Sequence, residues 1–488
     1  MPFNSLTFLI YSFFFLVVYW FFIKKRKIKL LLIFTGSLFF YGMAEIKFVP
    51  LILFCILFNY YSAIYINNLI SALKKKILLL SAIFLNLATL AIFKYYFFFS
   101  KNINLLLDTL GLNFSFPILN FLLPIGISFF TFQNISYIVD VFKKKIKPEK
   151  NFFLFADYIL FFPQLVAGPI LRASEIFHQF SKQPVLKLDN MYNGLKRLIF
   201  GLFLKFVIAD NLGQLVDRSY STNIDFLSGV DVFTMSYLFG FQIYFDFSAY
   251  SHIAIGIALL MSIKLPENFN LPYHSLSPKE FWTKWHISLS SWVRDYIYLP
   301  MLRYKSKDYS TGGFKNIIVH DNLWIKTNLI LIYTWCLMGF WHGPNWKFII
   351  WGFIHSQIII ASKIINKLIG SKNNKYYKFL GWLFTLQVIM LSWIPFRTNN
   401  ISETFKVWGK LFDFNNWTNL SFNENTYIVA FVITSGYFLL PYILKSYKII
   451  FKKYLILNLI IEMLLLFILI AMIIIFFQQT NQFIYFQF

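Results

Sequence analysis

The stretch LILIYTWCLMGFWHGPNWKFIIW, residues Leu329 to Trp351, is an apolar run of membrane-spanning length that contains one histidine, His342. An ionisable group inside a spanning segment is costly unless it serves a cavity or a pathway, so His342 is the first candidate functional residue. Gly343 and Pro344 interrupt the helix directly after it. Because backbone groups freed at membrane depth must be satisfied by protein or by water in a cavity, the break predicts that His342 borders a cavity. The alternative is a buried histidine hydrogen-bonded to neighbouring backbone.

The composition excludes an ordinary soluble domain. Of the 488 residues, 58% are hydrophobic, 22% are aromatic and 14% are charged, as is typical of a polytopic membrane protein. A formal net charge of +24 would suggest nucleic-acid binding in a soluble protein. Here the lysines form short clusters between apolar runs, as the positive-inside rule requires, so we expect membrane lipid and no nucleic acid as a partner.

A membrane span needs about 20 apolar residues, and this rule predicts about eleven full spans with shorter re-entrant and interfacial helices between them. Runs that contain Pro124, Pro163 with Pro169, and Pro344 are expected to be broken or re-entrant. Neither an internal repeat nor a long linker is visible. The sequence therefore predicts an all-α polytopic membrane protein with a single domain over residues 1–488.

Charge clusters and cysteines set further expectations. The first apolar run, residues 6–23, is followed by a basic cluster at residues 24–29, and lysines precede the last run. The positive-inside rule therefore places both termini outside. Cys55 and Cys336 lie within apolar runs, so neither a disulfide framework nor a metal site is predicted.

The most patterned connecting segment runs from Ser277 to Tyr298. Ser277 as N-cap, Pro278 at the first helical position and Glu280 predict the start of a helix. Aromatic and apolar residues then recur at helical spacing, at Phe281, Trp282, Trp285, Leu289, Trp292 and Tyr296. The pattern predicts one amphipathic helix at the cytoplasmic interface. His286 lies beside this stripe, either as a hydrogen-bonding anchor or as a catalytic group.

Few catalytic chemistries suit these residues. The sequence contains no Gly-rich phosphate loop, zinc-protease histidine pair or Gly-x-Ser-x-Gly elbow, which argues against the corresponding hydrolases. A neutral imidazole in a membrane cavity remains, suited to removing a proton from a hydroxyl that attacks an activated acyl group. Asn345 and the indole groups of Trp341 and Trp346 are candidates for orienting the acyl carbonyl.

Polar residues also occur in other apolar runs, where each needs a partner. They are Asp140, Gln164, Asp210 with Asn211, and Asp246 with Ser248. Helix-to-helix hydrogen bonding is the alternative to a functional role for each of them.

Eight stretches along the chain carry a resemblance to a known family. They are LPIGISFFTFQ (123–133), FPQLVAGPI (162–170), FVIADN (206–211), YFDFSAY (244–250), LPENFN (265–270), FWTKWHISLS (281–290), RDYIY (294–298) and GFWHG (339–343). This set resembles the bacterial membrane-bound O-acyltransferases, in the branch of the alginate and peptidoglycan O-acetyltransferases. The teichoic-acid D-alanyl transferase is a more distant relative.

The resemblance implies a ring of helices around a funnel-shaped core, where a thioester donor from the cytoplasmic side meets an acceptor from the other side. It also implies that His342 is the catalytic residue and that His286 is required for activity. Within or beside the matching stretches lie the candidate substrate-binding residues Trp341, Trp285, Arg294, Asp295 and Asn345.

The chain ends in FIYFQF, residues 483–488, which resembles the C-terminal motif of this branch and of the small partner protein of the D-alanyl system. In that motif the tyrosine is proposed to carry the acyl group. The resemblance therefore implies a catalytic role for Tyr485, with His342 as the base that a phenol of pKa about 10 needs. An interfacial aromatic anchor is the alternative.

The expected function is transfer of acetyl from acetyl-CoA, with no permanently bound cofactor, in the bacterial inner membrane. An extracytoplasmic SGNH-type O-acetyltransferase is the expected partner, and peptidoglycan is the expected envelope polysaccharide. The alternatives are O-acetylation of alginate or another exopolysaccharide, or D-alanyl transfer to teichoic acid. A transporter or flippase, which would also contain buried polar groups and broken helices, and a non-catalytic scaffold are readings of a different class.

Overall fold

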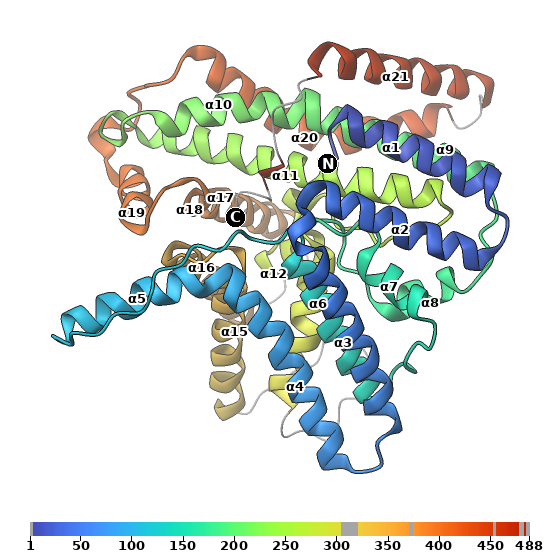
Figure 1. Cartoon of the computed structure of the whole chain (residues 1–488). Coiled ribbons are helices and arrows are strands. Elements are labelled where there is room, and N and C mark those ends of the chain that lie inside the picture. The colour runs from blue at the N-terminus through green and yellow to red at the C-terminus, as the bar shows by residue number, and fades with distance from the viewer. Residues whose placement is uncertain (1–2, 304–320, 370–373, 452–454, 478–482, 485–488) are drawn as a thin grey trace. The chain divides into compact units, whose positions relative to one another are not determined.

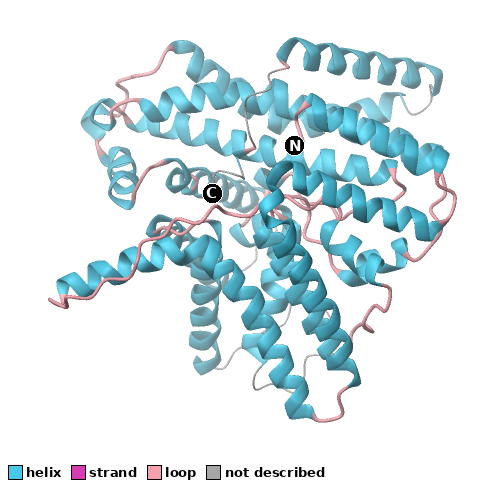
Figure 2. Cartoon of the chain, in the orientation of Figure 1, coloured by secondary structure: helices cyan, strands magenta, loops and turns pink. Residues whose placement is uncertain are grey.

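The computed structural model describes residues 3–303, 321–369, 374–451, 455–477 and 483–484. Over these residues the chain forms helices joined by loops, with no strand among them (Figure 2). Eight helical stretches in the described residues are long and apolar enough to cross a membrane. The predicted class, an all-α polytopic membrane protein, is confirmed, whereas the ring of helices around a funnel stays a prediction.

The length rule and the structure differ in the number of spans. Helices α2 (Arg26–Glu45) and α3 (Val49–Asn68), predicted as two spans, form with the short η2 (Ile46–Phe48) one stretch of 43 residues. A straight helix of that length would measure about 65 Å, twice the roughly 30 Å hydrocarbon layer. Figure 1 shows that α2 and α3 run in different directions. The predicted runs at 6–23, 121–142 and 152–171 contain helices of fewer than 18 residues, and the 22-residue helix Asp321–His342 is not among the eight stretches, where about eleven spans were expected.

The contacts divide the chain into two compact units. Unit 1 comprises residues 1–198 and 250–267, and unit 2 comprises residues 199–249 and 268–488. Helices α9 (Leu188–Phe203) and α11 (Gly229–Leu260) each contribute residues to both units. The single domain expected from the sequence stays a prediction.

Unit 1 contains two of the predicted proline breaks. Its helices, besides α2, α3 and parts of α9 and α11, are α1 (Leu6–Val17), η1 (Val18–Phe22), α4 (Ala72–Leu90), η3 (Ala91–Tyr95), α5 (Tyr96–Thr109), α6 (Ile127–Phe142), α7 (Phe152–Leu160) and α8 (Ala173–Phe180). Helix α6 begins only after Pro124, and α7 ends before Pro163. Both predicted breaks are confirmed.

The non-helical segment after α7 is buried, so its backbone groups need partners. The Phe162 N–H donates to Ser37 Oγ at 3.2 Å, and the Ala167 N–H donates to the Tyr250 hydroxyl at 3.2 Å. Side chains from helices α2 and α11 thus replace the hydrogen bonds that the interrupted helix lacks.

Unit 2 contains most of the residues singled out by the sequence. Its helices, besides parts of α9 and α11, are η4 (Leu204–Ala209), α10 (Asp210–Ser221), η5 (Ile224–Phe226), η6 (Pro272–His274), α12 (Pro278–Lys284), α13 (Ile287–Val293), η7 (Arg294–Tyr298), α14 (Leu299–Arg303), α15 (Asp321–His342), α16 (Trp346–Ile369), α17 (Lys375–Ser392), α18 (Ile394–Arg397), α19 (Ile401–Gly409), η8 (Lys410–Phe412), η9 (Phe414–Asn416), α20 (Glu424–Phe451) and α21 (Leu455–Phe476).

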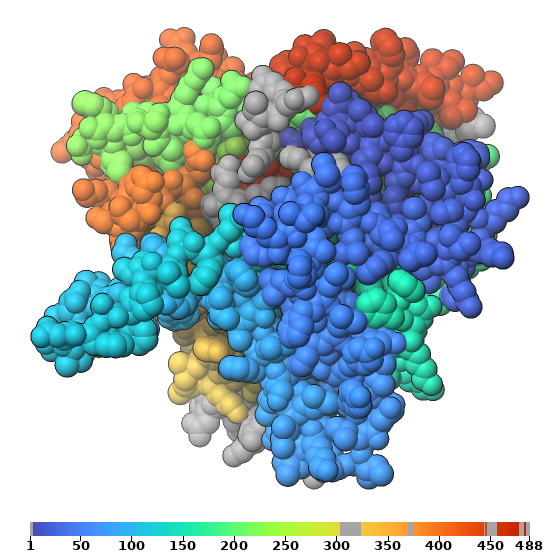
Figure 3. Space-filling model, in the orientation of Figure 1, coloured from blue at the N-terminus to red at the C-terminus, as the bar shows by residue number. Residues whose placement is uncertain are grey.

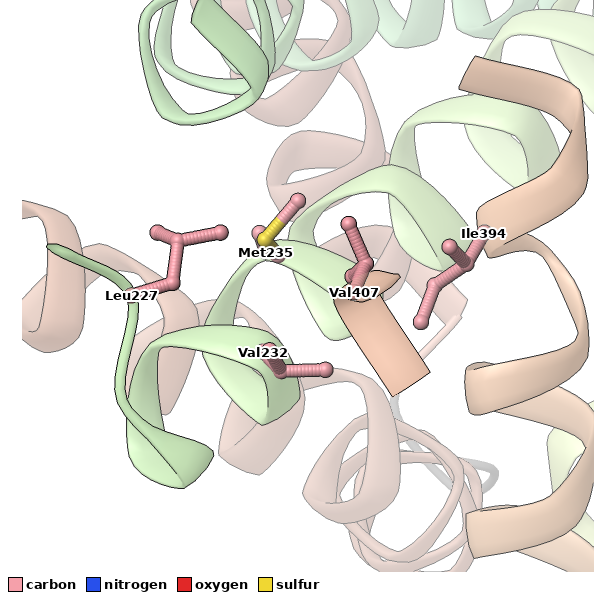
Figure 4. Packing of buried hydrophobic residues seen from close by; sticks show 5 residues of the cluster. All are labelled: Leu227, Val232, Met235, Ile394 and Val407. Atoms are coloured by element: carbon pink, nitrogen blue, oxygen red, sulfur yellow. The ribbon is translucent and has the colours of Figure 1, made fainter. Parts of the chain in front are cut away.

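Two parts of unit 2 show opposite ways of placing apolar side chains. Leu227, Val232, Met235, Ile394 and Val407 form a buried cluster between α11, α18, α19 and the loop before α11 (Figure 4). The most apolar window of α21, in contrast, has no buried residue, and Figure 3 shows this helix along the outer surface in dark red. An apolar helix left open in this way suits contact with lipid.

The segment from Ser277 to Tyr298 differs from the prediction of one surface helix. Ser277 caps α12 as expected, since its hydroxyl accepts the Glu280 N–H at 3.2 Å. The helix then ends at Lys284, and α13 begins at Ile287 after a break at His286. Most of the aromatic stripe is buried in protein. The prediction of a continuous amphipathic helix was wrong, because periodicity does not reveal a backbone reversal at one residue.

Candidate active site

His342 is the last residue of α15, and the predicted helix break at Pro344 follows it. The next helix, α16, begins at Trp346. Asn345 lies in the turn, and its Oδ1 accepts the Lys347 N–H at 3.1 Å. Asn345 therefore caps α16, while the side chain of Trp346 is exposed. Contact of either residue with an acyl group stays a prediction.

Close packing of α15 against α16 fixes the position of His342. A Cβ atom at Gly339 would collide with the carbonyl oxygen of Phe348, and one at Gly352 would collide with that of Trp335. Only glycine permits this approach of the two backbones, as is common between helices in membranes. The two glycines hold the end of α15 against the first turns of α16.

The His342 side chain lies among aromatic rings and is 9% exposed. Its ring centroid is 4.9 Å from that of Trp341, 5.1 Å from that of Trp351 and 5.3 Å from that of Phe396. These rings come from α15, α16 and α18. The imidazole is therefore oriented by packing from three helices.

His286 occupies the break between α12 and α13 and is 1% exposed. Its φ of 42° lies in the left-handed region, which is uncommon for a residue with a side chain. The strained turn is supported by Asn268, whose carbonyl oxygen accepts the Ile287 N–H at 3.0 Å. Strained residues of this kind cluster at functional sites.

The hydrogen bonds around Asn268 assign the tautomer of His286. Asn268 Oδ1 accepts the Ser288 N–H at 3.3 Å and the Ser288 hydroxyl at 2.9 Å, so this atom is the oxygen of the amide. His286 Nδ1 lies 3.2 Å from the same oxygen and must therefore donate a proton to it. Nε2 then carries the lone pair. Burial lowers the pKa of His286 to about 3, so the ring is neutral at physiological pH.

Trp341 brings the two histidines into one site. Its ring centroid is 6.4 Å from that of His286 and 4.9 Å from that of His342. The sequence predicted roles for all three residues but not that one indole contacts both imidazoles. Trp341 thus joins the two imidazoles in one cluster of rings, and its contact with substrate stays a prediction.

A cavity of about 510 Å³ lies beside this site, within the size range of small-molecule sites. Its lining includes Trp282, Trp335 and Met338, and also Ile287, the residue after His286. Met338 is one helical turn before His342, which is not itself part of the lining. The cavity wall therefore reaches the neighbours of both histidines.

Four cationic residues contribute to the cavity lining. Lys279, Arg294, Lys363 and Lys367 belong to its lining, which contains no carboxylate among the described residues. Burial lowers the pKa of Lys279, and an anionic ligand would reverse that effect. Arg294 Nε donates to Asp295 Oδ1 at 2.7 Å, which places these two predicted residues at the cavity edge.

The remaining predicted residues have separate positions. Trp285 packs among other rings, with centroids 5.5 Å from Phe281 and 4.9 Å from Trp393, and does not line the cavity. Tyr485 lies outside the described residues. Substrate contact by Trp285 and a catalytic role for Tyr485 stay predictions.

The sequence reasoning missed His355 on α16. Its side chain is fully buried, its Nε2 lies 3.0 Å from Ser392 Oγ, and its ring centroid is 4.5 Å from that of Trp351. It also stacks on Trp335, a residue of the cavity wall. The missed signal was a histidine within an apolar run, the same feature that singled out His342.

Most of the other polar residues in apolar runs have partners. Asp140 Oδ1 pairs with Lys145 Nζ at 3.2 Å, and Gln164 Nε2 donates to Gln133 Oε1 at 3.5 Å. Asp210 and Asp246 share a partner that the sequence reasoning also missed, Lys205.

Comparison with known proteins identifies relatives along most of the chain. A peptidoglycan O-acetyltransferase of Helicobacter pylori is 36% identical over 400 residues, covering 76% of this chain and 71% of the relative. A probable alginate O-acetylase AlgI of Azotobacter vinelandii is 32% identical, covering 90% and 85%. A teichoic acid D-alanyltransferase of Streptococcus thermophilus is 30% identical, covering 57% and 68%.

A model of the membrane-bound O-acyltransferase family matches residues 141–314. These residues include the turn that holds His286 and part of the cavity wall. The long relatives extend the match beyond this range over nearly the whole chain. The protein is therefore an acyltransferase and belongs to the membrane-bound O-acyltransferase family.

Proposed function

We propose that this enzyme takes acetyl from acetyl-CoA on the cytoplasmic side of the bacterial inner membrane and passes it outward for O-acetylation of an envelope polysaccharide. Peptidoglycan is the proposed polymer, because the relative from Helicobacter pylori carries that name. An extracytoplasmic SGNH-type O-acetyltransferase is the proposed final partner. We also propose that both termini lie on the outer side of the membrane. The distribution of lysines supports this orientation.

The observation that carries the donor assignment is the cavity beside the two histidines. Coenzyme A combines a phosphate-rich end with a narrow thioester arm. Four cationic side chains and no carboxylate in the described lining suit the phosphates. The aromatic and apolar wall formed by Trp282, Trp335 and Met338 suits the arm, and it leads towards the end of α15.

In the proposed reaction, the imidazole of His342 takes the proton of the acceptor hydroxyl as the oxygen attacks the thioester carbonyl carbon. The carbon–sulfur bond then breaks, and the imidazolium returns the proton to the leaving thiolate. The products are an acetyl ester and a free thiol. The proposed acceptor is the Tyr485 phenol, whose aryl ester would then be passed to the external partner.

His286 has a different proposed task. Its Nδ1–H is held by Asn268, so the ring is fixed in orientation and presents Nε2 on its other side. Its neighbour Ile287 belongs to the cavity wall. We assign His286 to the donor side, where it orients the thioester, and His342 to proton transfer.

The test is mass spectrometry of ester groups on isolated envelope polymers from a strain that lacks the gene. Wild-type enzyme should restore acetyl to peptidoglycan, and His342→Ala enzyme present at equal level should not. If the strain that lacks the gene loses acetyl from another polysaccharide instead, that polysaccharide takes the place of peptidoglycan as the proposed polymer. Loss of D-alanyl from teichoic acid, with acetyl unchanged, would overturn the acetyl assignment in favour of the chemistry named for the Streptococcus thermophilus relative.

A further inference from the structure

A cluster of three charged residues is buried in unit 2 away from the two histidines' contacts. Lys205 Nζ lies 2.8 Å from Asp210 Oδ1 and 2.8 Å from Asp246 Oδ1. The three side chains are 1%, 7% and 3% exposed. Burying each ion costs several kcal/mol before the ions attract each other. Because ionisable residues inside membrane proteins are usually functional, we expect this cluster of one ammonium and two carboxylates to have a role beyond packing.

An unusual helical turn creates the cluster. Lys205 belongs to the π-helix η4 (Leu204–Ala209), and Asp210 is the first residue after this π-helix. In an α-helix, residues five apart point about 140° away from each other. The wider π-turn bonds residues five apart and brings them onto one side. Asn211 Nδ2 donates to the carbonyl oxygens of Phe206 and Val207, at 3.1 and 2.9 Å, and so stabilises this turn.

The C-terminal segment, residues 477–488, reaches this cluster through Phe483 and Ile484, which with Phe477 are its described residues. The backbone N–H of Ile484 donates to Asp246 Oδ2 at 2.7 Å. Lys205 Nζ lies 4.4 Å from the ring centroid of Phe483. Phe483 and Ile484 are 1% and 5% exposed. Earlier in the same segment, the ring of Phe477 packs 4.9 Å from that of Phe206 in the π-helix.

The two carboxylate oxygens of Asp246 thus have different partners. Oδ1 meets the ammonium of Lys205, and Oδ2 holds a backbone N–H that lies 238 residues away in the sequence. A carboxylate bonded to a backbone N–H makes a charge-assisted hydrogen bond, which fixes the register of the bound segment. The cation–π contact of Lys205 adds a preference for an aromatic ring at position 483.

We propose that Lys205 and Asp246 form a docking site for the chain's own C-terminal segment, with Asp246 as the positioning residue, whereas Asp210 balances the charge of Lys205. Ile484 directly precedes Tyr485, the proposed acceptor, in the sequence. The inference rests on the proposed function in one respect, namely that Tyr485 is the acceptor. The docking itself is a separate claim, which rests on the contacts of Lys205 and Asp246 with residues 483 and 484.

Two matched variants separate docking from simple charge balance. Asp246→Asn and Asp210→Asn each replace one carboxylate beside Lys205, but of the two only Asp246 is hydrogen-bonded to the described residues 483 and 484. Each is made in full-length enzyme whose cysteines at 55 and 336 are replaced by alanine and which carries Ile484→Cys as a reporter. The new cysteine keeps its backbone N–H. The measurement is the rate at which a small maleimide labels position 484 in native membranes.

The parent should label slowly, because position 484 is buried. Asp246→Asn should label at least about ten-fold faster, as expected for loss of about 1.4 kcal/mol of anchoring. Asp210→Asn should stay within about two-fold of the parent. Equal acceleration in both variants, or no acceleration in Asp246→Asn, would overturn the docking site.

A second pair leaves the charged cluster intact, which guards against misfolding of the aspartate variants. Ile484→Pro removes the N–H donor, whereas Ile484→Val keeps it. Ile484→Pro should lower envelope acetylation at least about ten-fold, with Ile484→Val near wild type. Normal acetylation by Ile484→Pro would overturn the positioning role. If labelling shows docking but Tyr485→Phe acetylates normally, docking stands and the acceptor role of Tyr485 fails.

Discussion

The surroundings of His286 and His342 differ in the force that orients each imidazole. His286 is held by a hydrogen bond to Asn268 in a backbone turn with positive φ. His342 is packed by the rings of Trp341, Trp351 and Phe396 at the end of a broken helix. A hydrogen bond fixes which nitrogen carries the proton, whereas ring packing fixes the plane of the imidazole. The difference suits one histidine to orientation and the other to proton transfer.

The largest expected effect follows from replacing His342. His342→Ala and His342→Gln should lower acetyl transfer by at least about 100-fold, since general-base catalysis contributes about 100- to 10,000-fold. Acetyl on envelope polymers is measured by mass spectrometry at matched enzyme levels in the membrane. His178→Ala, at an exposed histidine of α8, is the control and should act normally. Wild-type acetylation by His342→Gln would remove the contrast between the two histidines.

Tyr485→Phe sharpens the same contrast, because it tests the group on which His342 is proposed to act. The variant keeps the ring but removes the phenol oxygen. We expect a loss of acetylation similar to that of His342→Ala, with unchanged use of the donor. Normal acetylation would show that Tyr485 is an aromatic anchor and that another hydroxyl meets His342.

Replacing His286 or its hydrogen-bond partner should affect the donor side. His286→Ala and Asn268→Ala should each raise the KM for acetyl-CoA about ten-fold, because a lost charge-neutral hydrogen bond costs about 1 kcal/mol and orientation adds to it. Initial rates in membrane vesicles at varied acetyl-CoA give KM. Ser288→Ala removes one of several donors to Asn268 and should have a smaller effect. Unchanged KM in both main variants would contradict the donor assignment.

The cationic cavity lining predicts a moderate effect of charge. Lys279→Gln and Lys363→Gln should each raise the KM for acetyl-CoA about three- to ten-fold, with a smaller penalty at high salt. Lys375→Gln, at an exposed residue outside the lining, is the matched control. Equal effects at all three positions would indicate a general surface potential rather than a donor site.

The smallest effect concerns stability and pH. Burial lowers the pKa of His286 to about 3, whereas an unfolded histidine has a pKa of about 6.5. Between these values the unfolded chain binds a proton that the folded chain does not, so His286 makes stability fall as pH falls. His286→Gln should weaken this dependence by up to about 1.4 kcal/mol per pH unit. Thermal unfolding in detergent at about pH 7.5 and pH 5.5 measures it, and an unchanged dependence would place His286 in contact with water.

The sequence by itself determined the class of the protein and singled out most of the candidate site residues. Apolar runs of membrane length have few alternatives to helices, because backbone groups in lipid must be satisfied within the segment. The breaks near Pro124, Pro163 and Pro344 follow from the missing N–H of proline. His342 stood out because an ionisable group in an apolar run is costly. These are local effects, which composition and spacing can express.

Only the tertiary structure decided which of these residues meet. Periodicity predicted one helix through His286, but the contacts of Asn268, distant in sequence, stabilise a reversal there. The sequence pattern could not show that Trp341 contacts both histidines. Nor could it show that Lys205 forms ion pairs with both Asp210 and Asp246. Such pairings depend on how helices pack and on a π-turn that shifts one side chain around its axis. Whether burying a charge stabilises or destabilises the protein depends on its partner, and the fold determines which partner it has.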